Sequence, residues 1–453
     1  MYAIPHTIRR FAIDEDAAVT VLALTMLTAL LLVGSYAVDV GNVMRARTQL
    51  QVSVDSVAHA ALVQRELNSS TLAKAEALRY AETNMPQAQF GHIITESDIV
   101  FGNFNEADFR FTPNAGSRNA VQVTARRVAS KSNALDALLL KLVGFDKLDV
   151  VTSSTFTTFL PTCMREGYVA EARVDLQSNN VFQNGFCVHS NTRVEMNSNN
   201  VFEEGTIVSM PDLDNLVIPA SGMRTNVGLG TALREGQWNI KIIGRISNLI
   251  TWLETFARDK FEVLNPYPPY ITQDVLVNLP TPVQARSGTV YTMARFTPNR
   301  VNVITCTARV NSLTFNGSAL APIKDVVIIT KGCNITFGQG LVVENAVIAT
   351  TSTSAVSMTS PSGFQLGKND NCAEGGGAQL LTLGGVRLAA GMSAYNGQIL
   401  AAGDVYFRAN ANQIKGISIV SGRTIDTTSN GAAAFCGTGW SNNFMAAYFR
   451  MAL

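Results

Sequence analysis

The chain has 453 residues, enough for two or three domains beyond any anchor. Its 35 basic and 34 acidic residues leave a net charge of +1, so no long-range field would attract nucleic acid and we expect no nucleic-acid partner. Only 15% of the residues are charged, and small polar residues are abundant in the second half, which favours stacked β-structure over a helical enzyme domain.

The first predicted element is a transmembrane helix over residues 17–38, which include no charged side chain. At about 1.5 Å per residue it is about 33 Å long, enough to cross a hydrocarbon core of roughly 30 Å. Membrane lipid is therefore an expected partner through residues 17–38, with residues 1–16 as a cytoplasmic tail. The alternative is a cleaved signal peptide that ends near Ser35-Tyr36-Ala37, although its apolar region would usually be only about 7 to 15 residues long.

All the cysteines lie after this span, and their number is even, which is typical of an oxidising compartment. We expect three structural disulfides between neighbours in sequence, a choice guided only by locality among many possible pairings. The expected pairs are Cys163 with Cys187, Cys306 with Cys333, and Cys372 with Cys436. A bacterial inner-membrane protein, single-pass, with its C-terminal region periplasmic or surface-exposed, is the simplest geometry. Reduced, buried cysteines in a cytosolic domain are the alternative.

Helical periodicity continues beyond the span. Apolar residues recur at helical spacing from Val43 to Leu62, which predicts one long helix that leaves the membrane. A second helix is predicted over residues 72–84, ahead of Pro86.

A resemblance appears in this region. The apolar span is followed by AVDVG (37–41), TQLQ (48–51) and DSVAHAA (55–61). As a set, these segments resemble the N-terminal part of TadG-like proteins of the Tad (Flp) pilus-assembly system, with Asp39, Gly41, Gln51 and Asp55 as the family-motif residues.

The resemblance extends over roughly residues 10–160. Strand-like segments at 98–103 and 120–126, a helical segment at 134–143 and a β-rich segment at 150–159 follow in the order expected for that family. It implies a small periplasmic α+β assembly domain over residues 39–162, and other pilus-assembly proteins or pilins as partners. Many relatives carry a von Willebrand A domain, but Asp325 begins a strand-like run without the metal-binding loop, so no metal site is assigned.

Residues 163–453 are predicted to form a disulfide-containing, β-solenoid-like domain. SNNVF at 178–182 recurs at 198–202, and each copy is followed by a glycine, Gly185 or Gly205. A short repeat with Asn-rich corners suggests the rungs of a right-handed parallel β-helix. The alternative is a β-sandwich in which the match is accidental.

Residues 239–261 are predicted to form an amphipathic helical insertion, and NPYPPY at 265–270 an extended segment. We expect this helix to pack on the side of the solenoid or to cap an open end. A partner-binding helix is the alternative.

Catalytic motifs are missing from the sequence, and we expect that the protein is not an enzyme and binds no cofactor and no metal. The histidines are His6, His59, His92 and His189, which do not form a triad or ligand pattern. One enzymatic alternative remains, because acids on a β-helix can cleave polysaccharides; Asp370, Glu374 and Asp404 are the nearest candidates.

The predicted fold class is therefore a membrane-anchored α+β protein with a mainly β C-terminal region. The predicted function is that of a structural component of a Tad (Flp) pilus system, which binds other pilus proteins or an envelope glycan. The alternatives are a surface adhesin or minor pilin in the fibre, and a polysaccharide-active enzyme.

Overall fold

The computed structural model describes residues 15–183, 185–255, 283–373, 375–427, 429–437 and 443–453. Contacts divide the chain into two compact units. The first unit comprises Met1–Phe159 together with Phe449–Leu453, and the second comprises Leu160–Tyr448. The return of the last residues to the first unit has no counterpart in the sequence pattern.

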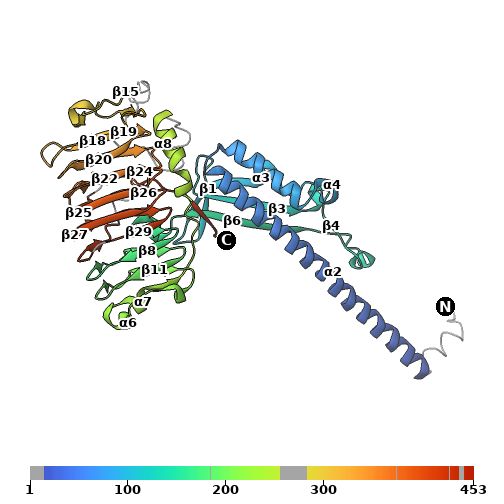
Figure 1. The fold of residues 1–453 in the computed structure, drawn as a ribbon. Helices are drawn as coiled ribbons and strands as arrows, with labels where there is room; N and C mark the ends of the chain where they lie inside the picture. Colours follow the sequence, from blue (N-terminus) through green and yellow to red (C-terminus); the bar gives the residue numbers. More distant parts are fainter. Residues whose placement is uncertain (1–14, 184, 256–282, 374, 428, 438–442) are drawn as a thin grey trace. The chain divides into compact units, whose positions relative to one another are not determined.

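The first unit is dominated by one continuous helix, α2 (Glu15–Arg65), followed by α3 (Ser70–Asn84) and the short α4 (Gln87–Phe90). The predicted long helix is thus present as a single element (Figure 1). Ser69 caps α3, its side chain accepting a hydrogen bond from the Leu72 amide, and α3 ends two residues before Pro86 as its sequence predicts.

A five-stranded sheet completes this unit, in the order β2-β1-β3-β6-β31 among the described residues. The strands are β1 (Ile99–Asn105), β2 (Arg110–Pro113), β3 (Ala120–Arg127), β6 (Val150–Phe159) and β31 (Tyr448–Met451). Helix α2 lies against β3 and β6, and its buried Leu50, Val54 and Val57 meet Val121 and Val123 of the sheet. This burial holds the second half of α2 in place.

Residues 134–143 do not form the predicted helix. They contain β4 (Leu135–Asp136) and a short 3-10 helix, Leu140–Val143, and β5 (Lys147–Leu148) pairs antiparallel with β4. In a helix over residues 134–143 the amides of Leu138, Leu139 and Leu140 would donate to the carbonyls of residues 134–136, but they donate to the Asp39 carboxylate instead.

The second unit is a stack of parallel strands, which we call the β-stack. Its described strands form one 24-stranded sheet in which the paired strands run parallel. The first strands of the β-stack in the chain are β7 (Gly167–Ala170), β8 (Arg173–Leu176), β9 (Val181–Phe182), β10 (Cys187–Ser190), β11 (Arg193–Met196), β12 (Val201–Phe202), β13 (Ile207–Met210) and β14 (Leu233–Glu235). After α8 (Ile246–Thr255) come β15 (Val283–Gln284), β16 (Val290–Tyr291), β17 (Val301–Thr305), β18 (Ser312–Phe315), β19 (Ile323–Lys331), β20 (Asn334–Phe337), β21 (Val342–Thr350), β22 (Met358–Ser360) and β23 (Gln365–Leu366). The last are β24 (Ala378–Thr382), β25 (Val386–Tyr395), β26 (Gln398–Ala401), β27 (Val405–Lys415), β28 (Ser418–Ser421), β29 (Thr424–Asp426) and β30 (Ala432–Ala434).

The repeated SNNVF segments are equivalent positions of adjacent coils. Val181 and Phe182 pair in parallel with Val201 and Phe202, and the two phenylalanine rings stack with centroids 5.1 Å apart. The Asn180 amide donates to the Asn200 side chain, which lies 20 residues further along the chain. One repeat is therefore one coil, and its inward side chains build the core with the next coil.

The chain enters the β-stack in the middle. Strand β7 pairs with β10 of the next coil on one side and with β28 on the other. We call the β28–β7, β29–β8 and β30–β9 pairings the seam, because they join the last coil of the chain to the first. The coils at both ends of the β-stack are thus made from internal segments.

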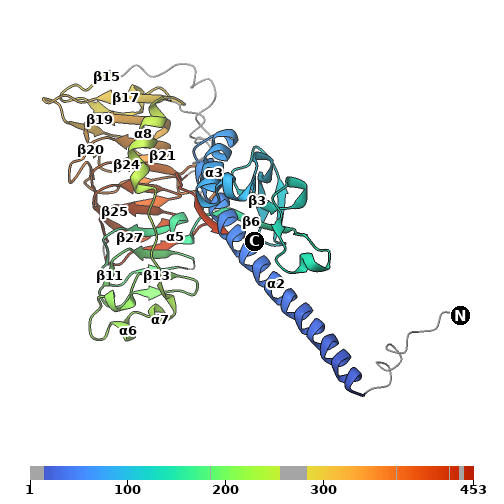
Figure 2. The same cartoon turned by 90° about the vertical axis from the view of Figure 1, so that its right-hand side faces the viewer.

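Helix α8 (Ile246–Thr255), preceded by a 3-10 turn at Ile243–Arg245, lies along the side of the β-stack against β17, β19 and β24 (Figure 2). The predicted start at residue 239 is wrong, because the Asn239 carbonyl accepts from the Tyr448 hydroxyl and the Lys241 amide. Residues 256–261 of the predicted helix, and the segment 265–270, lie outside the described residues. Side packing agrees with the first of the two positions expected for this helix.

Candidate functional site

Helix α2 changes its environment at Asp39. From residue 19 to Val38 its large apolar side chains are exposed, whereas Asp39 is buried and so are Ala46 and Leu50 further along. The helix is long and apolar enough to cross a membrane, and none of its most apolar window is buried in the protein. Asp39 thus marks the boundary within α2 between the exposed apolar part, residues 19–38, which we call the bare part of the helix, and the part that packs against the rest of the unit.

The Asp39 carboxylate holds a distant loop, residues 137–146 between β4 and β5, which we call the β4–β5 loop. Its Oδ1 accepts the Leu138 amide at 2.6 Å, and its Oδ2 accepts the amides of Leu139 at 2.9 Å and Leu140 at 2.6 Å. These three hydrogen bonds, which we call the Asp39 latch, fix the loop beside the point where α2 loses its protein contacts.

The Asp39 latch favours an ionised carboxylate. Burial by itself raises the pKa of Asp39, but the three backbone amides and the positive charge of Lys141 more than offset it, so the pKa is lower than usual. The carboxylate is therefore charged at neutral pH and accepts strong, charge-assisted hydrogen bonds.

The other family-motif residues lie further along α2. Gln51 donates from Nε2 to the Asp55 carboxylate at 2.8 Å, one helical turn away, and to the Ser153 carbonyl of β6 at 3.4 Å. A Cβ added at Gly41 would meet no atom within 4 Å. Packing within this unit therefore does not require a glycine at that position.

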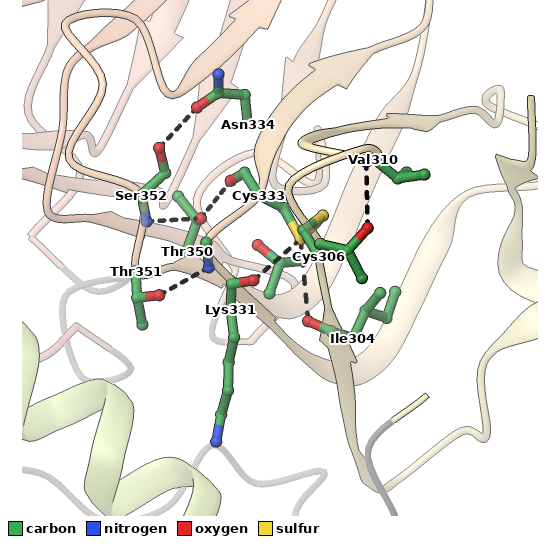
Figure 3. The surroundings of a disulfide bond; sticks show 12 residues. Ile304, Cys306, Val310, Lys331, Cys333, Asn334, Thr350, Thr351 and Ser352 are labelled. Carbon is green, nitrogen blue, oxygen red and sulfur yellow. Dashed lines mark hydrogen bonds between the residues drawn. A yellow bond between two sulfur atoms is a disulfide. The ribbon is translucent and has the colours of Figure 1, made fainter. Parts of the chain in front are cut away.

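Three disulfides lie in the second unit, and they join the cysteines that the locality argument pairs: Cys163–Cys187, Cys306–Cys333 and Cys372–Cys436. Figure 3 shows the surroundings of Cys306–Cys333. Around it, the Thr350 hydroxyl donates to the Cys333 carbonyl at 2.6 Å, and the Ser352 hydroxyl donates to Asn334 at 2.6 Å. The bridge thus links two coils inside a hydrogen-bonded part of the β-stack.

Glu166 lies at the seam. Its carboxylate is buried and accepts the amides of Cys436 and Gly437, each at 2.6 Å. Burial raises the pKa of Glu166, while the two amides act in the opposite direction. This contact fastens the end of the last coil to the start of the first, and the disulfide from Cys436 to Cys372 ties the same end to an earlier coil.

The acids considered for catalysis have local structural roles. Asp370 accepts the Ala373 amide at 3.2 Å, Asp404 accepts the Thr424 amide at 3.1 Å, and Glu374 lies outside the described residues. No interaction joins Asp370 to Asp404 in the part of the chain that the structure describes.

A stacked set of acids was missed by sequence reasoning. Asp426, Asp175 and Glu195 occupy matching positions on three successive coils, and we call them the acidic ladder. Arg173 contacts Glu195 at 2.8 Å and Asp175 at 3.7 Å. The 20-residue repeat could have revealed that Glu195 stacks on Asp175, but Asp426 is brought there only by the seam.

The pKa of Asp175 is raised, first by burial and then by the charge of Asp426, while Arg173 acts against both. The pKa of Asp426 is also raised, chiefly by burial. The acidic ladder is therefore a stack of negative charges that Arg173 compensates only in part.

The histidines show no shared site. His189 is buried, with Nδ1 2.7 Å from the Ser209 hydroxyl oxygen and Nε2 3.0 Å from the Asn191 side-chain oxygen Oδ1, and burial lowers its pKa. His59 packs against Phe156 in the first unit, and His6 lies outside the described residues. Within the described ranges no group of three or more His, Cys, Asp or Glu residues could hold a metal ion.

Three family models match the chain. Residues 17–65 match Flp pilus-assembly TadE/G-like, residues 58–155 match Tad-like Flp pilus-assembly, and residues 167–437 match a domain of unknown function (DUF7867). Comparisons with curated proteins and with solved structures give no match.

These matches confirm the resemblance that the N-terminal motifs indicate. They divide the chain where the structure does: the pilus-assembly models end within β6, and the third model begins with β7. The chain belongs to the DUF7867 family and carries, ahead of that domain, the TadE/G-like domains of Flp pilus-assembly proteins.

Proposed function

We propose that this protein is a structural component of a Tad (Flp) pilus system, anchored in the bacterial inner membrane by residues 17–38 with its remaining domains on the export side. The observation that carries the proposal is the abrupt change of exposure along α2 at Asp39. A soluble protein would have to leave a long apolar helix surface in water. Lipid is the environment that fits such a surface.

The export side is supported by the disulfides. The six cysteines of the second unit form three bridges, which are stable in the periplasm and rare in the reducing cytosol. An anchored chain with these bridges outside would leave only the residues before the span in the cytoplasm.

The β-stack would be the part that meets other pilus proteins. Its three sets of parallel ladders and its 20-residue repeat support a β-helix, and we propose that it is right-handed. Such a rod holds its surface in one shape, so little conformational entropy is lost when a partner binds. An experimental structure in which the coils wind left-handed would contradict this part of the proposal.

Membrane fractionation tests the anchor. Leu27 and Leu31 are exposed on α2, so the double variant L27R/L31R should fold normally but should pay a large penalty in the hydrocarbon core, about 2.5 to 3.5 kcal/mol per arginine. We expect wild-type protein to stay in carbonate-washed membranes and the variant to leave them. Leu72→Arg, at an exposed leucine outside the span, is the matched control and should behave as wild type.

The same cells test sidedness and role. Alkylation of intact protein should label no cysteine before reduction and all six afterwards. Deleting the gene should abolish assembled pili, which the wild type but not L27R/L31R should restore. Protein found in sheared fibres and absent from membranes would instead support a minor pilin or adhesin.

A further inference from the structure

The β4–β5 loop presents a dense group of exposed apolar side chains. It presents five exposed side chains within eight residues, with Leu142 77% and Phe145 62% exposed. The five are Leu138, Leu139, Leu142, Val143 and Phe145. Five large apolar groups on one short loop are unfavourable in water and indicate a surface that something covers.

The position of the loop indicates what covers it. The Asp39 latch holds Leu138 to Leu140 against Asp39. Asp39 directly follows Val38, which is the last exposed residue of the bare part of the helix. Figure 1 shows the loop beyond β4 extending alongside α2. The exposed apolar surface of the loop is thus continuous with the helix surface that the proposed function places in lipid.

The charges of the loop point to the same occupant. Between Asp136 and Lys147, two aspartates and two lysines cancel, so the loop has little net attraction for an anionic partner. Asp136 and Lys147 also form an ion pair with each other at the base of the loop. Contact through this surface would therefore depend on apolar burial, not on charge.

We propose that the β4–β5 loop is a second membrane contact, which inserts its apolar side chains into the interfacial layer of the phospholipid bilayer next to the end of the transmembrane helix. The proposal rests on the anchoring of residues 17–38. It adds a function for the loop: together with α2 it fixes the depth and tilt of the first unit at the membrane surface, because two contacts restrict a tilt that one helix leaves free.

Fluorescence quenching by brominated lipids tests the loop. Full-length protein with the single added cysteine Leu142→Cys is labelled with an environment-sensitive fluorophore without reductant, and it is reconstituted in vesicles of phosphatidylcholine alone. Leu30→Cys in the span and Leu72→Cys on α3 are labelled in the same way, since both leucines are exposed in the protein.

We expect a blue-shifted emission for the label at position 142, with stronger quenching by bromines near the headgroup than by bromines near the acyl-chain end. The label at position 30 should show the reverse order, and the label at position 72 should not be quenched. An unquenched label at 142 with a quenched label at 30 would overturn the loop proposal and leave the anchor intact. An unquenched label at 30 would instead contradict the anchor itself.

Two further results would also overturn the loop proposal. One is quenching at position 142 that appears only when anionic lipid is added or that is lost at high salt, since apolar insertion needs neither. The other is a label that stays exposed in vesicles but becomes shielded in native membranes only when the other pilus proteins are present, because a protein would then be the occupant.

Discussion

At the scale of single residues, a carboxylate at the end of an apolar run fixes a distant loop of the first unit. The sequence identifies Asp39 as part of a family motif, but not its partners, which lie 99 to 101 residues away. No local pattern encodes such a contact, because it exists only after the helix and sheet have packed. The role of Asp39 in the Asp39 latch had to come from the structure.

Asp39→Asn should loosen the β4–β5 loop. An amide side chain has one acceptor oxygen and no charge, so it cannot hold three amides equally well. We expect hydrogen exchange at Leu138 to Leu140 to accelerate by roughly tenfold or more. Asp55→Asn, which alters another carboxylate of the same helix, one that accepts from Gln51, should leave these amides protected.

The pH dependence of the Asp39 latch follows from its pKa. Because the folded pKa of Asp39 lies below the ordinary value of 3.8, the Asp39 latch contributes stability above that value and loses it as the pH falls through the lowered pKa. The protection of the three loop amides in wild type, taken relative to their intrinsic exchange rate at each pH, should therefore fall only in acid. A loss of protection between pH 7 and 5 would contradict the Asp39 latch.

The contribution of the acidic ladder to stability depends on pH in the opposite sense. The raised pKa values of Asp175 and Asp426 mean that the protonated forms are favoured on folding, so this contribution is complete below about pH 4 and is lost as the pH rises. Asp426→Asn should therefore increase the free energy of unfolding at neutral pH, by about 0.2–1 kcal/mol. The gain should vanish near pH 3, which urea unfolding at both pH values would measure.

Asp404→Asn is the matched control for that comparison. Asp404 accepts the Thr424 amide and faces Arg423 at 4.0 Å, and within the described ranges it makes no hydrogen bond or ion pair that involves a second acid. It should give no stabilisation at either pH. An equal gain from Asp426→Asn at pH 3 and pH 7 would show that charge is not the cause.

At the scale of elements, local sequence patterns predict secondary structure well where contacts between residues near in sequence determine it. Helices α2 and α3 follow from apolar spacing, a serine cap and a proline, and the SNNVF repeat corresponds to one coil. The predictions fail where distant groups compete for the backbone. Residues 134–143 have helical spacing, but Asp39 takes their amides, and α8 starts late because Tyr448 takes the carbonyl of Asn239.

Stacked rings make a testable element of the β-stack. Phe337 is fully buried, and its ring centroid lies 4.7 Å from the centroid of Phe364 and 6.4 Å from the centroid of Phe315. Phe337→Ala removes this packing and leaves a cavity, so we expect a loss of about 3–5 kcal/mol in the free energy of unfolding. The measurement is urea unfolding of the detergent-solubilised chain, followed by circular dichroism.

Leu320→Ala serves as the control, because Leu320 lies on the same β-stack but is 98% exposed. Its effect should stay within about 0.5 kcal/mol. If both variants unfold at the same urea concentration, the ring stack does not stabilise the coils.

At the scale of the whole molecule, the seam is the feature that sequence reasoning could not reach. The repeat predicts that coils stack, but it does not reveal that the chain enters between them. At the seam, the Gly431 amide donates to the Asn180 side chain across 251 residues of chain. Closing so large a loop has a high entropic cost. The seam is therefore where a covalent link would help most.

Cys372–Cys436 does not cross the seam, because both cysteines lie in the C-terminal coils, but it holds the segment whose Cys436 and Gly437 amides bond Glu166 across the seam. It encloses 64 residues, against 27 for Cys306–Cys333 and 24 for Cys163–Cys187. Loop entropy alone gives about 4.3 kcal/mol for the longest loop and about 3.5 kcal/mol for the shorter ones. Removing Cys372–Cys436 also frees the segment whose amides bond Glu166. The free energy of unfolding should therefore fall further than on removal of a shorter bridge, by more than the entropic difference of about 0.8 kcal/mol.

The double variant C372A/C436A should therefore unfold at a lower urea concentration than C306A/C333A, with early exposure of the seam. Hydrogen exchange at Gly167 to Ala170 and Ser418 to Ser421 reports the seam directly, since these residues pair with each other. Each pair of alanines removes one bridge and adds no buried polar group, so the two variants are matched. Equal midpoints, together with seam amides that remain as protected as in wild type, would mean that the parallel pairing closes the β-stack without its disulfide.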